Sequence, residues 1–206
     1  LEEKNVGGKA ASLSKLLRFG VQVPDGFALD KSLYVDFNRQ QQWPEGFLVE
    51  LKQKCASLKS ELVIVRSSAI GEDSGSHSFA GQLDSIVVNN EVSEVEKAIL
   101  TCWKGLQNDR VKAYEQIAGK RLTEMGVVIQ LFLEADYAGV TFTQAPTDDM
   151  CLYTEYVQGA GEQLVAGKIT PKNFSVHRLS SEVVQTPFNS DLLIKQSLHL
   201  KKCYNE

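Results

Sequence analysis

The sequence predicts an α+β fold with mixed sheets. In the first third of the chain, apolar residues recur at helical spacing, as in GKAASLSKLLRF at residues 8–19. From residue 62 onward, short β-branched runs alternate irregularly with helical stretches, and several of these strand-like runs follow one another directly. That mixed order is typical of an α+β domain. We expect one continuous domain, with a mostly helical part at 1–61 and an α+β part at 62–206.

Three helices are expected in the N-terminal part. The first covers residues 8–19 and ends at Gly20, where a left-handed C-terminal cap belongs. The VQVPDGFAL stretch at 21–29 favours an extended backbone leading into a turn, because it contains Val-Pro and Asp-Gly pairs. Asp30 is a suitable N-cap for a second helix, and Pro44 is a suitable first residue for a third.

The remaining elements follow from run length and periodicity. The last predicted helix stops without a capping residue, so we expect the native polypeptide to continue and the domain to be truncated at its C-terminus. We expect strands at 62–66, 85–88, 126–133, 138–144, 151–157 and 173–179, and helices at 91–106, 109–119 and 191–206.

Composition restricts the possible functions. The net charge of −4 argues against a general nucleic-acid or anionic-membrane surface, so any anion site has to be local. The four cysteines lie about fifty residues apart without Cys-x-x-Cys or zinc-ligand spacing, which favours free thiols in a reducing cytosol and no metal site. No long apolar run or signal peptide is visible. We therefore expect a soluble, cytoplasmic protein with no nucleic-acid or membrane partner.

The stretch NVGGKAASL at residues 5–13 is a candidate anion site. Two glycines before a helix allow a ligand to approach the backbone, the helix start carries partial positive charge, and Lys9 adds a full charge. A P-loop is excluded because Ala10 follows the lysine where Ser or Thr is required. A Gly-Gly turn with a solvated lysine is the alternative interpretation.

A second candidate is the long polar loop in VIVRSSAIGEDSGSHSFAGQLDSIVV at residues 63–88. Such a long polar loop is uncommon in a compact domain unless it has a function. Arg66 ends an apolar strand, where its planar guanidinium is able to bind two phosphate oxygens, and Ser67 and Ser68 add hydrogen-bond donors. Glycines such as Gly81 permit the turns needed around a polyphosphate. The acids Glu72 and Asp73 would repel phosphate unless they pair with Arg66, brace the loop or bind a metal; alternatively they are turn-forming surface acids. His77 is expected to be a loop histidine without a catalytic role.

Two further polar residues lie within apolar strands. Gln130 interrupts VVIQLFL, where an unpaired amide is costly, so it is either a satisfied core glutamine or a side chain that points into a ligand cleft. Glu155, in TEYVQGAGEQL, is a candidate contact for an adenine or ribose edge, as is Glu162. The GAGEQL segment is not a dinucleotide fingerprint, because Leu164 replaces the third glycine.

Taken together, these stretches resemble the ATP-grasp nucleotide-binding domain of the phosphoenolpyruvate synthase and pyruvate phosphate dikinase family. Five ordered blocks carry the resemblance over most of residues 5–176: NVGGKAASLSKLLRFGVQVPDGFAL, VRSSAIGEDSGSHSFAGQLDS, CWKGLQNDRVKAY, VVIQLFLEADYAGVTFTQAP and GAGEQLVAGKITPKNFSV.

The resemblance implies specific roles. Lys9 and Arg66 would neutralise ATP phosphates, with Arg66 the catalytic residue, and the segment from Gly81 to Ser85 would lie beneath them. Gln130 would line the pocket, and ATP with bridging Mg²⁺ would be the cofactors. The domain would pass a phosphoryl group from ATP to a histidine on a separate domain.

Parts of that machinery are absent from these 206 residues. The metal-binding acidic strand of the family, its phosphohistidine domain and its substrate domain are not in the sequence, and neither His177 nor His199 has the Thr-His setting of the carrier. A noncatalytic nucleotide-binding or regulatory module with the same fold is therefore an alternative, and a carboxylate–amine ligase is another. All three predict ATP binding.

Overall fold

The structure, a computed structural model, describes residues 1–71, 85–109, 111–112, 121–146, 148–165, 167–177 and 186–205. They belong to two compact units, Leu1–Leu133 and Glu134–Glu206. Each unit contains helices and one antiparallel sheet, so the predicted α+β class is confirmed. A strand from the N-terminal segment pairs with a strand beyond residue 124, so the first compact unit contains residues on both sides of position 61.

The sheet of the first unit has the strand order β1-β4-β2-β3, and all of its neighbouring strands are antiparallel. Strand β2 is longer than the predicted 62–66 because its pairing with β4 continues to Ala69. The four strands are β1 (Gly26–Leu29), β2 (Leu62–Ala69), β3 (Ser85–Asn89) and β4 (Met125–Leu131).

Strand β1 was not assigned from the sequence, and neither were the short helices α1 (Glu3–Val6) and α7 (Glu162–Val165). The β1 segment was expected to be extended before a turn, and its four residues form an edge strand that pairs Gly26 with Gln130 and Leu29 with Val127. Four residues are too few to show the alternation of apolar and polar residues that is typical of a strand. Its assignment depends on a partner about a hundred residues further along the chain.

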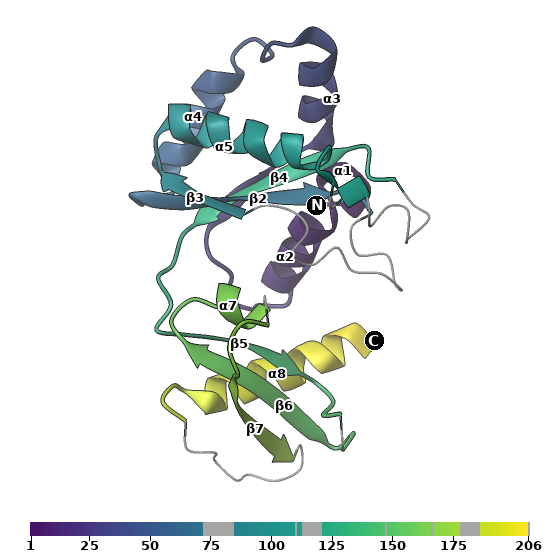
Figure 1. Ribbon diagram of the computed structural model, residues 1–206, viewed down its shortest axis with the longest axis vertical. Coiled ribbons are helices and arrows are strands. Elements are labelled where there is room, and N and C mark those ends of the chain that lie inside the picture. The colour runs from purple at the N-terminus through teal and green to yellow at the C-terminus, as the bar shows by residue number, and fades with distance from the viewer. Residues whose placement is uncertain are drawn as a thin grey trace. The chain divides into compact units, whose positions relative to one another are not determined.

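Three helices, α3 (Lys31–Gln40), α4 (Phe47–Ser57) and α5 (Val92–Gly105), cover one face of this sheet (Figure 1). The alternating residues Val63 and Val65 of β2 are fully buried against them and belong to the main hydrophobic core. Removing such apolar area from water is the main stabilising contribution to the unit. The predicted N-cap of α3 is confirmed, because the Asp30 carboxylate accepts a hydrogen bond from the Ser32 amide at 2.8 Å.

The opposite face of the sheet packs against α1 (Glu3–Val6) and α2 (Gly8–Arg18) (Figure 1). A smaller cluster forms there from Val6, Ala10 and Val128, with Leu13 and Ala28 packed against it. The predicted cap at Gly20 is confirmed, since this glycine has φ +74° and its amide bonds the Leu17 carbonyl. Helix α2 therefore lies on the face that is not occupied by the main core.

The second unit contains a three-stranded antiparallel sheet in the order β5-β6-β7. Aromatic rings of Tyr137, Tyr156, Phe174 and Phe188 contact one another on one of its faces. Its elements are β5 (Tyr137–Phe142), β6 (Cys151–Gln158), α7 (Glu162–Val165), β7 (Lys172–His177) and α8 (Ser190–Asn205).

Most predicted helices are present, with small shifts at their ends. Helix α4 begins at Phe47 instead of Pro44, whose carbonyl accepts a hydrogen bond from the Phe47 amide. The predicted helix at 109–119 falls largely outside the described residues. In the part of the chain that the structure describes, no helix has the length and apolar character needed to cross a bilayer.

Candidate nucleotide site

Arg66 lies on the face of the first sheet that also carries α2. Strand alternation directs Val63, Val65 and Ser67 toward the main core and Arg66 to the other side. In the strand register Arg66 is directly opposite Ser85 on β3 and Val128 on β4, so these side chains share one face. Arg66 is partly buried and Ser85 is exposed.

Gln130 lies on the same face, two residues from Val128 along β4. The residue is 4% exposed, and its side-chain amide contacts two other segments. Gln130 Nε2 donates to the Pro24 carbonyl at 3.1 Å, and Arg66 Nη1 donates to Gln130 Oε1 at 3.4 Å. The buried amide is thus satisfied within the protein while it contacts the arginine of the candidate site.

Lys9 approaches the same region from the first turn of α2. Its Nζ donates to the Ser67 carbonyl at 2.6 Å, and Ser67 directly follows Arg66. A second contact, from the Ala10 amide to Ser68 Oγ at 3.1 Å, holds the helix start against the end of β2. Lys9 is therefore held at the residue next to Arg66, inside β2, although the two cationic residues are far apart in the sequence.

The Gly7 turn makes this close approach possible. Gly7 has φ +83°, and a Cβ atom placed on it would lie 2.0 Å from the Ser68 carbonyl oxygen. The space at Gly126 on β4 is also too small for a side chain, since a Cβ atom placed there would lie 2.4 Å from the Val6 carbonyl oxygen. The backbone of the turn thus packs directly on β2 and β4, which only glycine permits at these positions.

The two serines have different contacts from those expected for phosphate donors. Ser67 is fully buried, its side chain lies on the main-core face, and its carbonyl holds Lys9. Ser68 is also fully buried, and its hydroxyl accepts a hydrogen bond from the Ala10 amide. That amide is one of the free N–H groups at the helix start that were expected to bind an anion. In this structure, therefore, both serines contact the α2 segment and help to orient Lys9.

A small cavity of about 160 Å³ lies between α2 and the sheet. Its lining includes Ala10, Leu13, Ala28, Val128 and Gln130, and within the described part of the chain it includes neither Lys9 nor Arg66. It is thus an apolar space next to the charged region, with Gln130 shared between the two.

Several residues of the predicted phosphate loop lie outside the described residues. Gly81 is among them, together with Glu72, Asp73 and His77. Gly71, at the start of the loop, is described and has φ +82°. The predicted role of Gly81 therefore stays a prediction from sequence.

Glu155 lies in the second unit, in the middle of β6 between Val140 of β5 and Asn173 of β7. Its carboxylate accepts a hydrogen bond from the Tyr153 hydroxyl at 3.0 Å. This hydrogen bond, with smaller contributions from desolvation and from the Glu155 charge, raises the pKa of Tyr153 above its ordinary value. Glu155 therefore presents a carboxylate whose position is fixed by a neighbouring tyrosine.

The other face of the same sheet borders a larger cavity of about 630 Å³ that sequence reasoning did not find. Tyr137, Tyr156 and Phe188 form its aromatic wall, and the Thr141 and Thr154 hydroxyls hydrogen bond to each other at 3.0 Å beside it. Strand alternation separates this cavity from Glu155, whose side chain lies on the opposite face.

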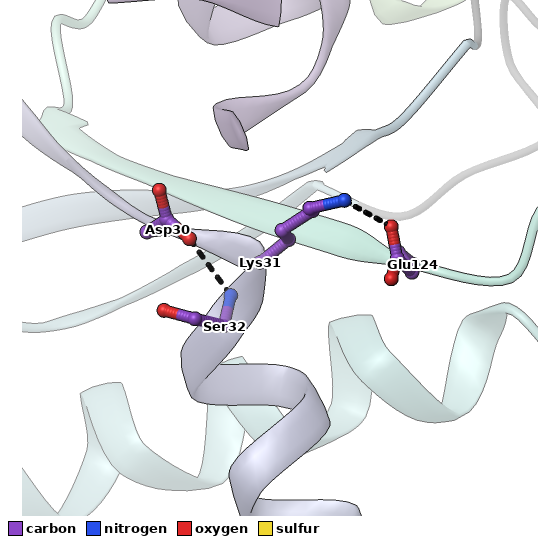
Figure 2. Close-up of polar contacts among 4 residues, drawn as sticks. All are labelled: Asp30, Lys31, Ser32 and Glu124. Carbon is purple, nitrogen blue, oxygen red and sulfur yellow. Dashed lines mark hydrogen bonds and ion pairs between the residues drawn. The ribbon is translucent and has the colours of Figure 1, made fainter. Parts of the chain in front are cut away.

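An ion pair connects helix α3 to the residue that precedes strand β4 of the first sheet. Figure 2 shows Lys31, the first residue of α3, pointing toward Glu124, while Asp30 caps the same helix through the Ser32 amide. The Lys31 and Glu124 side chains are 29% and 34% exposed. The two residues are 93 positions apart in the sequence, and no local motif predicts that they pair.

The described residues offer no cluster of metal-ligating side chains. Among them, no group of three or more His, Cys, Asp or Glu side chains is arranged so that it could hold a metal ion. Magnesium is therefore assigned no ligand in this part of the chain.

An arginine on one sheet face, with a lysine of α2 bonded to the next strand residue, is consistent with a domain that binds phosphate-bearing ligands. The AMP/ATP-binding domain of pyruvate phosphate dikinase matches residues 40–200. The chain belongs to this family, so the predicted ATP-grasp-like class and ATP-binding function are confirmed. Arg66, Ser85, Gln130 and Glu155 lie within the matched residues, and Lys9 precedes them.

Individual relatives agree with this assignment. The chain is 30% identical to the prodigiosin synthesizing transferase PigC of Serratia marcescens over 89% of the chain and 23% of that protein. It is 31% identical to the uncharacterized phosphotransferase YvkC of Bacillus subtilis over 86% of the chain and 24% of that protein. It is also 31% identical to the phosphoenolpyruvate synthase of Pseudomonas aeruginosa over 87% of the chain and 29% of that protein. The chain thus spans about a quarter of the length of these relatives.

Proposed function

We propose that the chain binds the phosphates of ATP on the sheet face that carries Arg66, with Lys9 supplying a second positive charge. We further propose that the polypeptide to which it belongs passes a phosphoryl group from this ATP to a histidine on a separate domain. One observation supports the proposal most strongly: the Lys9 ammonium is hydrogen-bonded to the backbone of Ser67, the residue after Arg66. Two cations held at neighbouring positions of β2 form a local anion site in a chain whose net charge is −4.

The two cations have complementary chemistry. The planar guanidinium of Arg66 is suited to bind two oxygens of one phosphate, whereas Lys9 is a compact charge on a flexible stem. Arg66 is partly buried, so its attraction for a phosphate is screened less than that of a fully exposed arginine. In the proposal Arg66 is the catalytic residue, because it contacts the group that is transferred.

The neighbouring residues support this pair. Ser85 lies directly opposite Arg66, and Gln130 accepts a hydrogen bond from it, so both are proposed to line the phosphate site. Ser67 contributes through its carbonyl, which holds Lys9. From the sequence, we also propose that Gly81 lies beneath the phosphates. Glu155 is proposed to contact an adenine or ribose edge.

Phosphoryl transfer would depend on positioning and on neutralising charge, since a protein has little covalent chemistry to perform on a metaphosphate-like group. Lys9 and Arg66 would orient the phosphates and stabilise the negative charge that moves between oxygens. Magnesium, when bound, would supply further neutralisation of the phosphate charge. The proposal assigns no Mg²⁺ ligand among the described residues, and it places the reaction in the cytoplasm, as the composition predicts.

Labelling of the whole polypeptide with radioactive ATP tests the transfer step. ATP labelled in its γ- or β-phosphate is incubated with the protein, and the label is sought on a histidine as a bond that acid breaks and alkali preserves. We expect the label in the wild type and its loss in Arg66→Ala. ATP binding without any labelled protein would favour the noncatalytic nucleotide-binding module instead.

A further inference from the structure

The Lys31–Glu124 ion pair joins two segments of the first unit. Lys31 begins α3, and Glu124 immediately precedes β4. Both side chains are about one-third exposed, at 29% and 34%. Partial burial makes an ion pair less screened by solvent than a fully exposed one. The pair thus attaches the start of β4 to a helix that is itself fixed by the Asp30 cap (Figure 2).

The backbone of Glu124 extends the β2–β4 ladder by one further bond. Its carbonyl accepts a hydrogen bond from the Ile70 amide at 3.0 Å, just beyond the last paired residues, Ala69 and Met125. The ends of strand ladders open more readily than their centres. A side chain that holds Glu124 in place therefore limits opening at this end of the sheet.

The same end of the ladder supports the Lys9 turn. Ser68 pairs with Gly126 in the register, and the Ser68 hydroxyl accepts the Ala10 amide. The Gly126 backbone is packed against the Val6 carbonyl, because a Cβ there would lie 2.4 Å from that oxygen. Opening of the ladder at residues 124–126 would remove the surface on which the Gly7–Lys9 turn is packed.

We propose that Lys31 and Glu124 are positioning residues for the nucleotide site, which act by holding the end of the β2–β4 ladder against which Lys9 is oriented. Neither residue contacts the nucleotide in this proposal. The inference rests on the proposed function of Lys9. It predicts that removing the pair lowers ATP affinity only while Lys9 is present, because the loss operates through the placement of that lysine.

A double-mutant cycle measures this dependence. ATP affinity is determined by calorimetry on the full chain for wild type, Lys31→Met, Lys9→Met and the double variant. We expect Lys31→Met to weaken binding about three- to tenfold, and to have no further effect in the Lys9→Met background. Arg39→Met is the matched control, since it breaks an exposed ion pair with Asp36 on the same helix, and we expect wild-type affinity from it.

Two further measurements separate positioning from a general loss of stability. Hydrogen exchange at the Ile70 amide is expected to speed up in Lys31→Met and to stay unchanged in Arg39→Met, because the Ile70 bond to Glu124 lies at the proposed point of opening. The charge-swapped variant Lys31→Glu with Glu124→Lys is expected to recover part of the lost affinity. No recovery in the swapped variant would argue against the ion pair as the cause.

The double-mutant cycle also distinguishes failure of the proposed ATP-binding role of Lys9 from failure of the positioning role of the Lys31–Glu124 pair. If Lys9→Met binds ATP as well as wild type, the proposed function of Lys9 fails. The positioning role alone is overturned if Lys9→Met weakens binding and Lys31→Met leaves it unchanged. It is also overturned if Lys31→Met weakens binding equally in the wild-type and Lys9→Met backgrounds.

Discussion

Lys9 Nζ donates a hydrogen bond to the Ser67 carbonyl across 2.6 Å, joining residues that are 58 positions apart in the sequence. This contact places a lysine from the α2 start beside the strand residue that follows Arg66. Because the acceptor is a neutral backbone oxygen, the bond holds the lysine stem beside β2 while the ammonium keeps its positive charge. The arrangement explains how a glycine turn and a strand arginine contribute to one site.

Removing the Lys9 charge is expected to weaken ATP binding. Lys9→Met keeps the length of the stem and loses the ammonium, so it should cost about 1.5–3 kcal/mol of binding free energy, the usual value for a charge-assisted contact. Lys15→Met removes the same charge from the same helix, where Lys15 lies over the Phe19 ring, and should leave affinity unchanged. Equal losses in the two variants, measured by calorimetry, would mean that only overall charge matters.

Gly7→Ala is expected to destabilise the first unit strongly. Gly7 has φ +83° and ψ 166°, a region nearly restricted to glycine, and its added Cβ would collide with the Ser68 carbonyl. We expect a loss of about 3 kcal/mol or more in the free energy of unfolding. Gly20→Ala is the matched control, because Gly20 has φ +74° and nothing within 4 Å of a built Cβ, so it should lose only about 1 kcal/mol. Urea unfolding of both variants gives the comparison, and equal losses would contradict the packing described for the turn.

The cysteines are expected to react at two distinct rates. Cys55 and Cys102 are 2% and 1% exposed, and burial raises the pKa of the Cys55 thiol, so little thiolate is accessible at neutral pH. Cys151 and Cys203 are partly exposed. Labelling with a disulfide reagent should therefore modify Cys151 and Cys203 quickly in the folded protein and all four thiols in urea. Rapid labelling of Cys55 in the folded protein would contradict its burial.

Tyr153 is expected to titrate at unusually alkaline pH. Its hydrogen bond to Glu155 raises its pKa, so the neutral hydroxyl is favoured in the folded state. The stabilisation is present below the ordinary tyrosine pKa near 10 and is lost as the pH rises through the higher folded value. An ultraviolet titration of wild type and Glu155→Gln, each compared with its Tyr153→Phe counterpart, measures this shift. The pKa should fall toward its ordinary value in Glu155→Gln, and an unchanged value would show that Glu155 is not the cause.

Much of the fold was predictable from local sequence signals. The Asp30 cap, the Gly20 terminus and the β-branched runs of β2 and β4 each carry their own pattern, and each appears in the structure. Strand β1 was not predictable in this way, because four residues carry no clear period and its partner is distant. The pairing of β1 with β4 also explains why the compact units divide after residue 133.

The candidate site shows the same distinction between side-chain chemistry and geometry. Arg66 and Lys9 were identified from charge and glycine pattern, and strand alternation explains why Arg66 lies on the α2 face. The contacts of Ser67 and Ser68 depend on where α2 packs, which the sequence alone does not specify. The Lys31–Glu124 pair is likewise a tertiary contact, since neither residue belongs to a local motif.

The most direct test of the account is calorimetric titration of ATP into the 206-residue chain, with wild type, Arg66→Ala and Arg39→Ala compared. We expect wild type and Arg39→Ala to bind with about 4–6 kcal/mol, which corresponds to a Kd from tens of micromolar to about 1 mM. Arg66→Ala should lose about 1.5–3 kcal/mol of this, because it removes the guanidinium from the proposed phosphate site. Equal ATP affinities for wild type and Arg66→Ala would contradict the assignment of the Arg66 face as the phosphate site.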